Sequence, residues 1–229
     1  MATATGYRDG VKVAMDGPAG VGKSTLSRRL AVEIGVPRLD TGSMYRAITW
    51  ACIRGRYDPA NERLCTMLAD LSILELEDGE VVRVDGEDVR AAIRSPEVTA
   101  AVSAVSAHYG VREALSGQQR RYALEHGVVM DGRDIGTIVL PDADVKIFLG
   151  ATDEVRAARR LAELEAAAGE SGRALDVAAV LADVRRRDRF DSTRQLSPLR
   201  PAPDAVHIDN SSADLTVALK EILALVPRT

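Results

Sequence analysis

One stretch near the N-terminus constrains this chain more than any other, because it fits the pattern G-x-x-x-x-G-K-[ST] of a phosphate-binding loop. Its glycines permit positive φ and a close approach to an anion, so that successive N–H groups form a nest for phosphate oxygens. Lys23 adds a positive charge for the β- and γ-phosphates, and the Ser24 hydroxyl is suited to Mg²⁺. The full stretch is Gly17, Pro18, Ala19, Gly20, Val21, Gly22, Lys23, Ser24 and Thr25.

The residues around this loop supply the context that the pattern requires. Val11–Asp16 reads as a buried strand before it, and Leu26, Leu30 and Ile34 recur at helical spacing after it. The positive end of that helix would face the same phosphates. The alternative is an ordinary glycine-rich turn, but a chance match to the pattern in a chain of this length is on the order of 1%. The sequence therefore predicts a bound nucleoside triphosphate, with Mg²⁺.

The composition narrows the class of protein. The 229 residues are 46% hydrophobic but only 3% aromatic, which predicts a large and mainly aliphatic core. The formal net charge of −4 argues against a general nucleic-acid binder. The chain contains no run of 18 apolar residues, so we expect no membrane-spanning helix. No apolar surface stripe stands out, and we expect a monomer.

Two further features bear on the compartment. Cys52 and Cys65 lack CxxC spacing and a neighbouring histidine cluster, so we interpret them as buried free thiols of a cytoplasmic protein. Residues 1–10 are polar and lack the apolar segment of a signal peptide. We expect this N-terminal segment to be disordered.

Strand and helix patterns alternate along most of the chain. This alternation is typical of an α/β protein with an open parallel sheet covered by helices on both faces. In such a sheet, ligands bind beyond the carboxyl ends of the strands. The five strand candidates are Lys12–Met15, Val36–Leu39, Val128–Met130, Val145–Leu149 and Val206–Ile208.

Residues 62–100 interrupt the alternation. Leu74–Leu76 and Val81–Val84 flank an Asp-Gly pair, and Asp-Gly between two β-prone runs predicts a hairpin. We therefore predict a small antiparallel insert carried on the main domain. Helical segments are expected around the hairpin, over Arg63–Leu71 and Pro96–Ala107.

Charged residues follow two of the predicted strands, at the edge where a ligand would lie. Asp40 or Thr41 can cap a helix whose first turns carry Arg46, although an arginine there can also be an ordinary solvated side chain. The third strand is followed by Asp131, as in a Walker B strand, and then by the Gly-flanked loop 132–137. Loops at strand ends commonly carry function.

Two helical segments separated by a gap at Gly169–Gly172 precede the last strand. The second helix is expected at about residues 176–188, and its end runs into a basic stretch at residues 185–194. The planar fork of arginine suits bidentate contacts with phosphate. The basic stretch can be a solvated face with i,i+4 ion pairs. Because it accompanies a phosphate loop, we favour a mobile lid.

Together these segments resemble the bacterial cytidylate kinases, a family of nucleoside monophosphate kinases, over about residues 11–225. The resemblance implies phosphoryl transfer from ATP to CMP or dCMP, with Mg²⁺. The implied fold is an α/β P-loop kinase with a five-stranded parallel sheet, an antiparallel insert that binds the monophosphate, and a helical lid. The motifs that carry the resemblance are Asp16–Thr25, Asp40–Arg46, Val111–Ala114, Asp131–Thr137, Pro141–Leu149 and the Arg187–Arg194 segment.

The resemblance also implies a division of the chain. Residues 11–229 would form one kinase unit after the disordered segment 1–10. Its core would comprise about residues 11–61, 101–155 and 195–229. The insert would occupy about residues 62–100, and the lid about residues 156–194.

Individual roles follow from the same resemblance. The acceptor phosphate would be held at the positions of Thr41, Arg46, Arg133 and Arg194. Cytosine would be read at the positions of Ser103, Arg112 and Asp134, and contacts near the pentose would come from Arg187 and Asp191. A carboxylate at position 134 fits this chemistry, because it accepts from the cytosine N4 amine, whereas uracil presents an acceptor there. Which of Arg185, Arg186 and Arg189 contacts ATP stays open.

Catalysis would rest on positioning and charge neutralisation, because the CMP phosphate oxygen itself attacks the γ-phosphorus. Lys23 would hold the donor. Ser24 is the expected protein ligand of Mg²⁺, with Asp16 or Asp131 acting through water. The transferring group would be neutralised by Arg133, Arg187 and Arg194.

Three other functions fit the sequence less well. A shikimate- or dephospho-coenzyme-A-type kinase is disfavoured by the hairpin insert and by the loop 132–137. A GTP-binding switch needs N-K-x-D and D-x-x-G motifs, and the sequence contains neither. A nucleic-acid-binding ATPase is disfavoured by the acidic net charge and the scarcity of aromatic residues.

Overall fold

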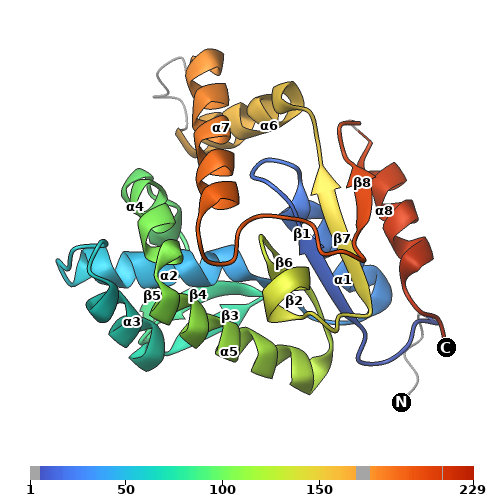
Figure 1. Ribbon diagram of the computed structural model, residues 1–229, viewed down its shortest axis with the longest axis horizontal. Helices are drawn as coiled ribbons and strands as arrows, with labels where there is room; N and C mark the ends of the chain where they lie inside the picture. The colour runs from blue at the N-terminus through green and yellow to red at the C-terminus, as the bar shows by residue number, and fades with distance from the viewer. Residues whose placement is uncertain (1–5, 169–175, 213) are drawn as a thin grey trace.

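The structure is a computed structural model that describes residues 6–168, 176–212 and 214–229. At its centre lies a five-stranded parallel sheet in the order β2-β6-β1-β7-β8, with helices on both faces (Figure 1). This arrangement confirms the predicted α/β fold. The strands are β1 (Lys12–Asp16), β2 (Arg38–Asp40), β6 (Val128–Gly132), β7 (Val145–Gly150) and β8 (Val206–Asp209).

The second strand differs from its prediction, because it covers Arg38–Asp40 rather than Val36–Leu39. Pro37 has no N–H to donate to a sheet, and its carbonyl alone takes part by accepting from Val129 N at 2.9 Å. The shift places Asp40 at the ligand edge of the sheet. There its side chain accepts from Ser43 N and caps helix α2 (Thr41–Arg54).

The sheet separates two aliphatic layers, and β1 contributes to both. Val13 and Met15 pack with α1 (Lys23–Ile34) and α8 (Leu215–Leu225) on one face. Ala14 packs on the other face, in the cluster that contains the buried residues of α2 and α5 (Tyr109–His126). The alternation follows from the period of two in a strand. Val13–Asp16 of β1 are all buried, and the phosphate loop begins directly after this buried strand.

The predicted hairpin insert is present as β3 (Leu74–Glu77) and β4 (Glu80–Val84), and a short β5 (Glu87–Asp88) that was not predicted follows. Asp78 and Gly79 both have positive φ, as two-residue hairpin turns require. Val81 and Val84 are buried in the same cluster as Leu39 and Met130 of the sheet. The insert therefore shares the core of the main domain. Its helices are α3 (Glu62–Leu71), the 3₁₀ turn η1 (Ala92–Arg94) and α4 (Pro96–Ala107).

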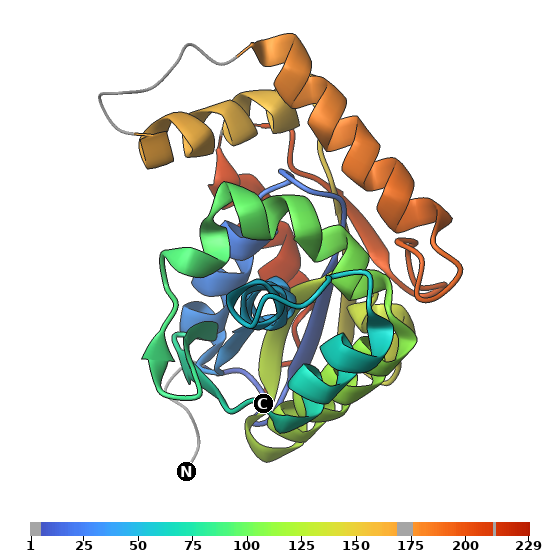
Figure 2. The same ribbon diagram turned by 90° about the vertical axis from the view of Figure 1, so that its left-hand side faces the viewer.

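Helices α6 (Asp153–Ala168) and α7 (Val177–Thr193) lie side by side across the ligand edge, as Figure 2 shows. The prediction ended the second helix near residue 188, and this was wrong: the basic stretch belongs to the helix up to Thr193. No glycine or proline interrupts it, and ion pairs from Asp183 to Arg186 and Arg187 support it. The predicted gap Gly169–Gly172 lies outside the described residues.

Tyr7, in the predicted N-terminal disordered segment, is ordered. Tyr7 is buried and forms an antiparallel bridge with Arg228, so the expectation of disorder over residues 1–10 is wrong for this residue. Cys52 and Cys65 are free and fully buried, with their Sγ atoms 3.2 Å apart, and burial raises the pKa of both thiols. This confirms the interpretation of buried thiols. None of the described helices is long and apolar enough to cross a membrane.

Candidate functional site

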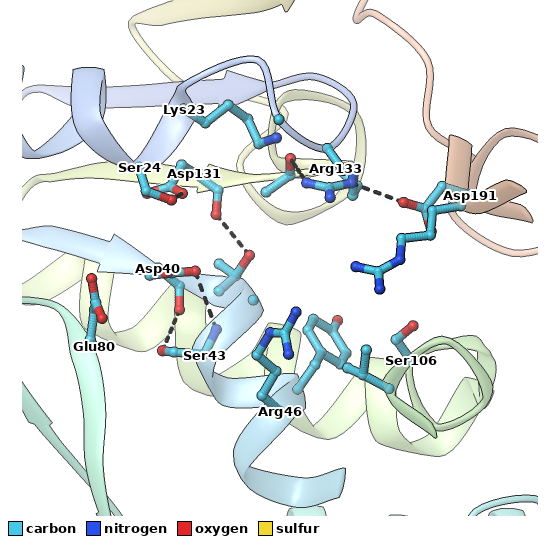
Figure 3. Close-up of a pocket in the computed structure, with 18 of the residues that line it drawn as sticks. Lys23, Ser24, Asp40, Ser43, Arg46, Glu80, Ser106, Asp131, Arg133 and Asp191 are labelled. Atoms are coloured by element: carbon cyan, nitrogen blue, oxygen red, sulfur yellow. Dashed lines mark hydrogen bonds and ion pairs between the residues drawn. The ribbon is translucent and has the colours of Figure 1, made fainter. Parts of the chain in front are cut away.

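A pocket of about 430 Å³ opens at the carboxyl ends of the sheet strands, under α6 and α7 (Figure 3). The structure brings most of the predicted site residues to its wall. Gly17, Pro18 and Val21 belong to the same loop but do not line it. The predicted residues that line the pocket are Ala19, Gly20, Gly22, Lys23, Ser24, Thr25, Thr41, Arg46, Ser103, Arg112, Asp131, Arg133, Asp134, Arg187, Asp191 and Arg194.

The phosphate loop connects β1 to α1 by glycines in conformations that other residues rarely adopt. Gly17, Gly20 and Gly22 have φ of 150°, 77° and 90°. A Cβ atom on Gly17 would lie 2.3 Å from Leu149 O, so the loop also needs this glycine for its approach to β7. Gly22 caps α1 without any side-chain hydrogen bond. The first N–H groups of α1 are therefore left for an anion.

Lys23 folds back over its own loop. Its Nζ donates to Gly17 O at 2.8 Å and to Pro18 O at 2.7 Å. Burial, together with the nearby Arg133, lowers the pKa of Lys23 to about 7, although Asp131 and Asp16 oppose this shift. An added polyphosphate would restore the charge of this ammonium group.

Asp16 anchors the loop that follows β6. Its Oδ1 and Oδ2 accept from Ile135 N and Gly136 N, both at 2.8 Å, at the start of the π-helical turn η2 (Ile135–Val139). Burial raises the pKa of Asp16 to about 6, although the two N–H groups partly offset that effect. No sequence motif marks this anchoring role of Asp16, but the two segments follow the neighbouring strands β1 and β6, which was a usable signal.

Asp131 carries the oxygen that faces Ser24. Its Oδ1 accepts from Ser27 Oγ at 2.7 Å and from Arg38 Nε at 3.1 Å. Its Oδ2 accepts from Ser24 Oγ at 3.3 Å. Arg38 and Ser27 were not singled out from the sequence, because neither belongs to a recognisable motif.

The donors around Ser24 fit a magnesium ion. Mg²⁺ usually takes one or two protein oxygens beside substrate phosphates and water, and a hydroxyl next to a carboxylate meets that requirement. Asp131 is suited to a water-mediated role, whereas both oxygens of Asp16 are engaged by backbone N–H groups. Within the described ranges, no group of three or more His, Cys, Asp or Glu residues could hold a metal by itself.

A buried ion pair forms the opposite wall of the pocket. Arg112 on α5 pairs with Asp134, and their side chains are only 7% and 5% exposed. Arg112 also donates to Ser106 O at 3.0 Å, and its guanidinium lies 5.3 Å from the centre of the Tyr45 ring. Ser103 lines the pocket on the same helix, α4, as Ser106. These planar polar groups can form hydrogen bonds with the edge of a base.

Two further ion pairs tie α7 to the pocket or to itself. Arg133 Nε lies 2.9 Å from Asp191 Oδ2, as Figure 3 shows, and Arg187 pairs with Asp183 at 3.0 Å. Arg194 donates to Ser197 O at 2.6 Å. The extension of α7 beyond its predicted end is what holds Asp191 against Arg133.

Among the described residues that line the pocket, Arg46 is the one arginine without an ion pair to a carboxylate. It donates to Thr99 Oγ1 at 2.9 Å and to Ile93 O at 3.4 Å. Burial and the neighbouring arginines, Arg187 first among them, lower the pKa of Arg46 to about 10. An anion in the pocket would relieve that repulsion. The nearby Thr41 Oγ1 donates to Asp131 O at 2.9 Å.

Of the arginines on α6 and α7, the described part of the pocket wall includes Arg160 and Arg187. Arg185, left open as an ATP contact, instead pairs with Asp153 at 2.8 Å. Arg156 is buried and donates to Ala19 O at 2.7 Å, which ties α6 to the phosphate loop. Arg160 was not proposed as a site residue from the sequence.

Comparison with known proteins gives the family. A family model described as cytidylate kinase matches residues 13–228. The cytidylate kinase of Rhodococcus opacus (strain B4) is 51% identical over 218 residues, which cover 93% of each chain. That of Geobacillus sp. (strain WCH70) is 43% identical over 222 residues, 96% of this chain and 97% of the relative. A solved structure of an uncharacterised protein from Eubacterium ventriosum ATCC 27560 matches this chain with a TM-score of 0.51 and 14% sequence identity. The match covers 93% of this chain and 96% of that chain, so the two proteins share the fold. The chain belongs to the cytidylate kinase family.

Proposed function

We propose that this protein transfers the γ-phosphoryl group of ATP to CMP or dCMP, which yields ADP and CDP or dCDP. The observation that carries the proposal is a single pocket with a phosphate loop on one wall and the buried Arg112–Asp134 pair on another. A nucleotide base and two sets of phosphates can occupy such a pocket together. Membership of the cytidylate kinase family supports the same reaction.

The donor end holds the triphosphate through the backbone. The N–H groups of the phosphate loop and of the first turn of α1 bind the phosphate oxygens. Lys23 exchanges its two carbonyl acceptors for the β- and γ-phosphates and stays protonated there. Mg²⁺, when bound, supplies charge neutralisation on these phosphates. Ser24 would hold it directly, and Asp131 would do so through water.

The acceptor phosphate binds among the arginines of the pocket. Arg46, Arg133 and Arg194 donate to its oxygens, and Thr41 lies beside them. Bidentate arginine contacts fix the attacking oxygen in line with the γ-phosphorus, and this positioning removes much of the entropic cost of the reaction. Arg133, Arg187 and Arg194 then stabilise the charge that spreads over the transferring group.

The base is read by Arg112, Asp134 and Ser103. Asp134 accepts from the cytosine N4 amine, and Arg112 donates to an acceptor on the same edge. Uracil would face the Asp134 carboxylate with its O4, an unpaired buried contact that disfavours it. Arg187 and Asp191 bind near the pentose, so that α7 contacts the acceptor directly.

The division of the chain into core, insert and lid also remains a proposal, with α6 and α7 as the lid. The contact of α7 with α4 of the insert supports closure over the acceptor, which would exclude water and limit ATP hydrolysis. We also propose that the protein acts as a monomer in the cytoplasm. The pocket wall formed by one chain and the free, buried cysteines support this.

A coupled assay of ADP release with ATP and Mg²⁺ tests the reaction, with CMP, dCMP, UMP and AMP as acceptors. We expect turnover with CMP and dCMP well above that with UMP. Comparable turnover with UMP would keep the kinase but reject base reading by Asp134. No turnover with any monophosphate would reject the proposed function.

A further inference from the structure

Arg38 on β2 is a buried cation that the proposed reaction does not use. Its side chain is 2% exposed, and it does not line the pocket. It lies directly under the donor end, and three carboxylates and a hydroxyl surround it. We call Arg38, Asp40, Glu80 and Asp131 the Arg38 cluster.

The guanidinium of Arg38 joins residues from four elements. Its Nε donates to Ser27 Oγ of α1 at 2.8 Å and to Asp131 Oδ1 of β6 at 3.1 Å. One terminal nitrogen donates to Glu80 Oε1 of β4 at 2.9 Å. The other lies 3.3 Å from Asp40 Oδ2, which belongs to β2 itself.

The charges of the cluster depend on this one arginine. Burial disfavours the charged guanidinium, but Asp131, Asp40 and Glu80 outweigh it and raise the pKa of Arg38. Arg28 and Arg94 also contact Glu80, but their side chains are each 57% exposed. Without Arg38, the Asp131 carboxylate would lose the buried cation that is bonded to it and would keep only the through-space charge of Lys23, and breaking a buried ion pair in this way is strongly disfavoured.

The contact with Arg38 also decides how Asp131 is oriented. Arg38 and Ser27 both bind Oδ1, which leaves Oδ2 directed at Ser24 Oγ. Figure 3 shows Ser24 and Asp131 next to each other at the pocket wall, with Asp40 and Glu80 on the same side. A planar arginine fork fixes a carboxylate more strictly than a single point charge does.

The hairpin insert holds Arg38 in turn. Gly79 O accepts from Asp40 N at 2.7 Å, and a Cβ atom on Gly79 would lie 2.1 Å from Arg38 O. Val81 N donates to Ser43 Oγ at 3.1 Å. The hairpin turn is thus docked on the end of β2, and this contact presents Glu80 to Arg38.

We propose that Arg38 is a positioning residue for the nucleotide-bound divalent cation: it orients Asp131 toward Ser24, and Glu80 of the insert fixes Arg38. The inference rests on the proposed function for the identity of the donor nucleotide. It extends that function by making the insert a support of the donor end as well as part of the acceptor site.

The test measures Mn²⁺ affinity in the presence of ADP by electron paramagnetic resonance, beside the Mg²⁺ dependence of CMP phosphorylation. For Arg38→Met we expect Mn²⁺ affinity to fall about 10-fold and the half-saturating Mg²⁺ concentration to rise about as much, within the range found when partners of metal ligands are removed. The KM for CMP should change less than about 3-fold. Arg38→Lys should recover part of the loss.

Arg83→Met is the matched control, because Arg83 lies on the same hairpin and is exposed, and its ion pair joins it to Glu75 rather than to the Arg38 cluster. It should leave both readouts unchanged. If Arg38→Met does not fold, Glu80→Gln serves instead, with an expected loss of Mn²⁺ affinity of about 3-fold.

If a folded Arg38→Met protein binds Mn²⁺ as tightly as the wild type, the proposal is overturned and Arg38 is a purely structural residue. Where Arg38→Met does not fold, wild-type Mn²⁺ affinity in Glu80→Gln has the same meaning. If the wild-type protein phosphorylates no monophosphate, the proposed function fails, yet the binding comparison with ADP still decides the role of Arg38.

Discussion

The two ends of the pocket hold their charges in different ways. At the donor end, Lys23 is bonded to the carbonyls of its own loop and Asp16 to two N–H groups of η2, whereas Asp131 is paired with Arg38 behind the pocket wall. At the acceptor end, four charged side chains are bonded to one another, in the Arg112–Asp134 and Arg133–Asp191 pairs.

This difference bears on how each end meets its substrate. Asp16 and the phosphate loop are fixed by the strand and loop geometry, so the backbone of the donor end is formed before a nucleotide arrives and the Lys23 side chain exchanges its partners there. Paired side chains can exchange a partner for a substrate group without disturbing the main chain. The two ion pairs of the acceptor end are therefore satisfied when it is empty and can rearrange when a substrate binds, whereas Arg46 has only neutral partners until an anion arrives.

The largest effect should come from breaking the donor end. In Lys23→Ala we expect kcat to fall about 1000-fold, because a buried cation at the transferring phosphate is lost. The KM for CMP should stay within about 3-fold, since the acceptor end does not depend on Lys23. Steady-state kinetics with each substrate varied in turn measure both values.

Lys220→Ala is the matched control for this variant, because Lys220 is exposed on α8. It should behave as the wild type. Turnover of Lys23→Ala near the wild-type level would remove Lys23 from the mechanism. A parallel loss of CMP affinity would show that the two ends are coupled rather than distinct.

Breaking the acceptor end should affect one substrate only. In Asp134→Ala we expect the KM for CMP to rise about 100-fold and the preference over UMP to disappear, because the acceptor for the N4 amine is lost and Arg112 is left without its partner. The KM for ATP should change little. Calorimetric titration of each nucleotide checks the result against the kinetics.

Asp142→Ala, which removes an exposed carboxylate from the loop between η2 and β7, is the control. An equal loss of ATP and CMP affinity in Asp134→Ala would count against base reading. It would point instead to a general collapse of the pocket.

Much of the fold could be predicted from the sequence because its signals are local. The phosphate loop, the apolar strands and the Asp-Gly turn each specify their own backbone, and all three are present, with a shift at β2. The errors lie where tertiary contacts decide. Strand β2 begins only after Pro37, at Arg38. The basic stretch of α7 continues as helix because ion pairs stabilise it. Tyr7 is ordered by pairing with the far end of the chain.

The candidate site shows the same limit. Residues in motifs, such as Lys23 and Asp134, could be named from the sequence, and the structure brings them to one pocket. Arg38 could not be named, because its partners Ser27, Glu80 and Asp131 are distant in the sequence, and Arg160 could not, because only the packing of the chain brings it to the pocket wall. The choice between Asp16 and Asp131 beside Ser24 also needed geometry, since both are acids at strand ends.

The smallest effect is expected where the two ends meet, at Asp40. Burial, reinforced by Asp131, raises the pKa of Asp40 from an ordinary 3.8 to about 6. The folded state then binds this proton more tightly than the unfolded state, so its contribution to stability is present below about pH 4 and is lost as the pH rises through about 6.

An asparagine side chain at this position does not titrate, yet asparagine caps a helix as well as aspartate does. We therefore expect the difference in unfolding free energy between Asp40→Asn and the wild type to grow by about 2 kcal/mol in favour of the variant as the pH rises from about 4 to about 7. Asp70→Asn, at an exposed position, is the control and should show no such change. Urea unfolding across this range measures it. If the unfolding free energies of Asp40→Asn and the wild type show the same dependence on pH, Arg38 keeps Asp40 ionised over the whole pH range. The position of Asp40 between the two ends of the pocket would then be as fixed as the donor end itself.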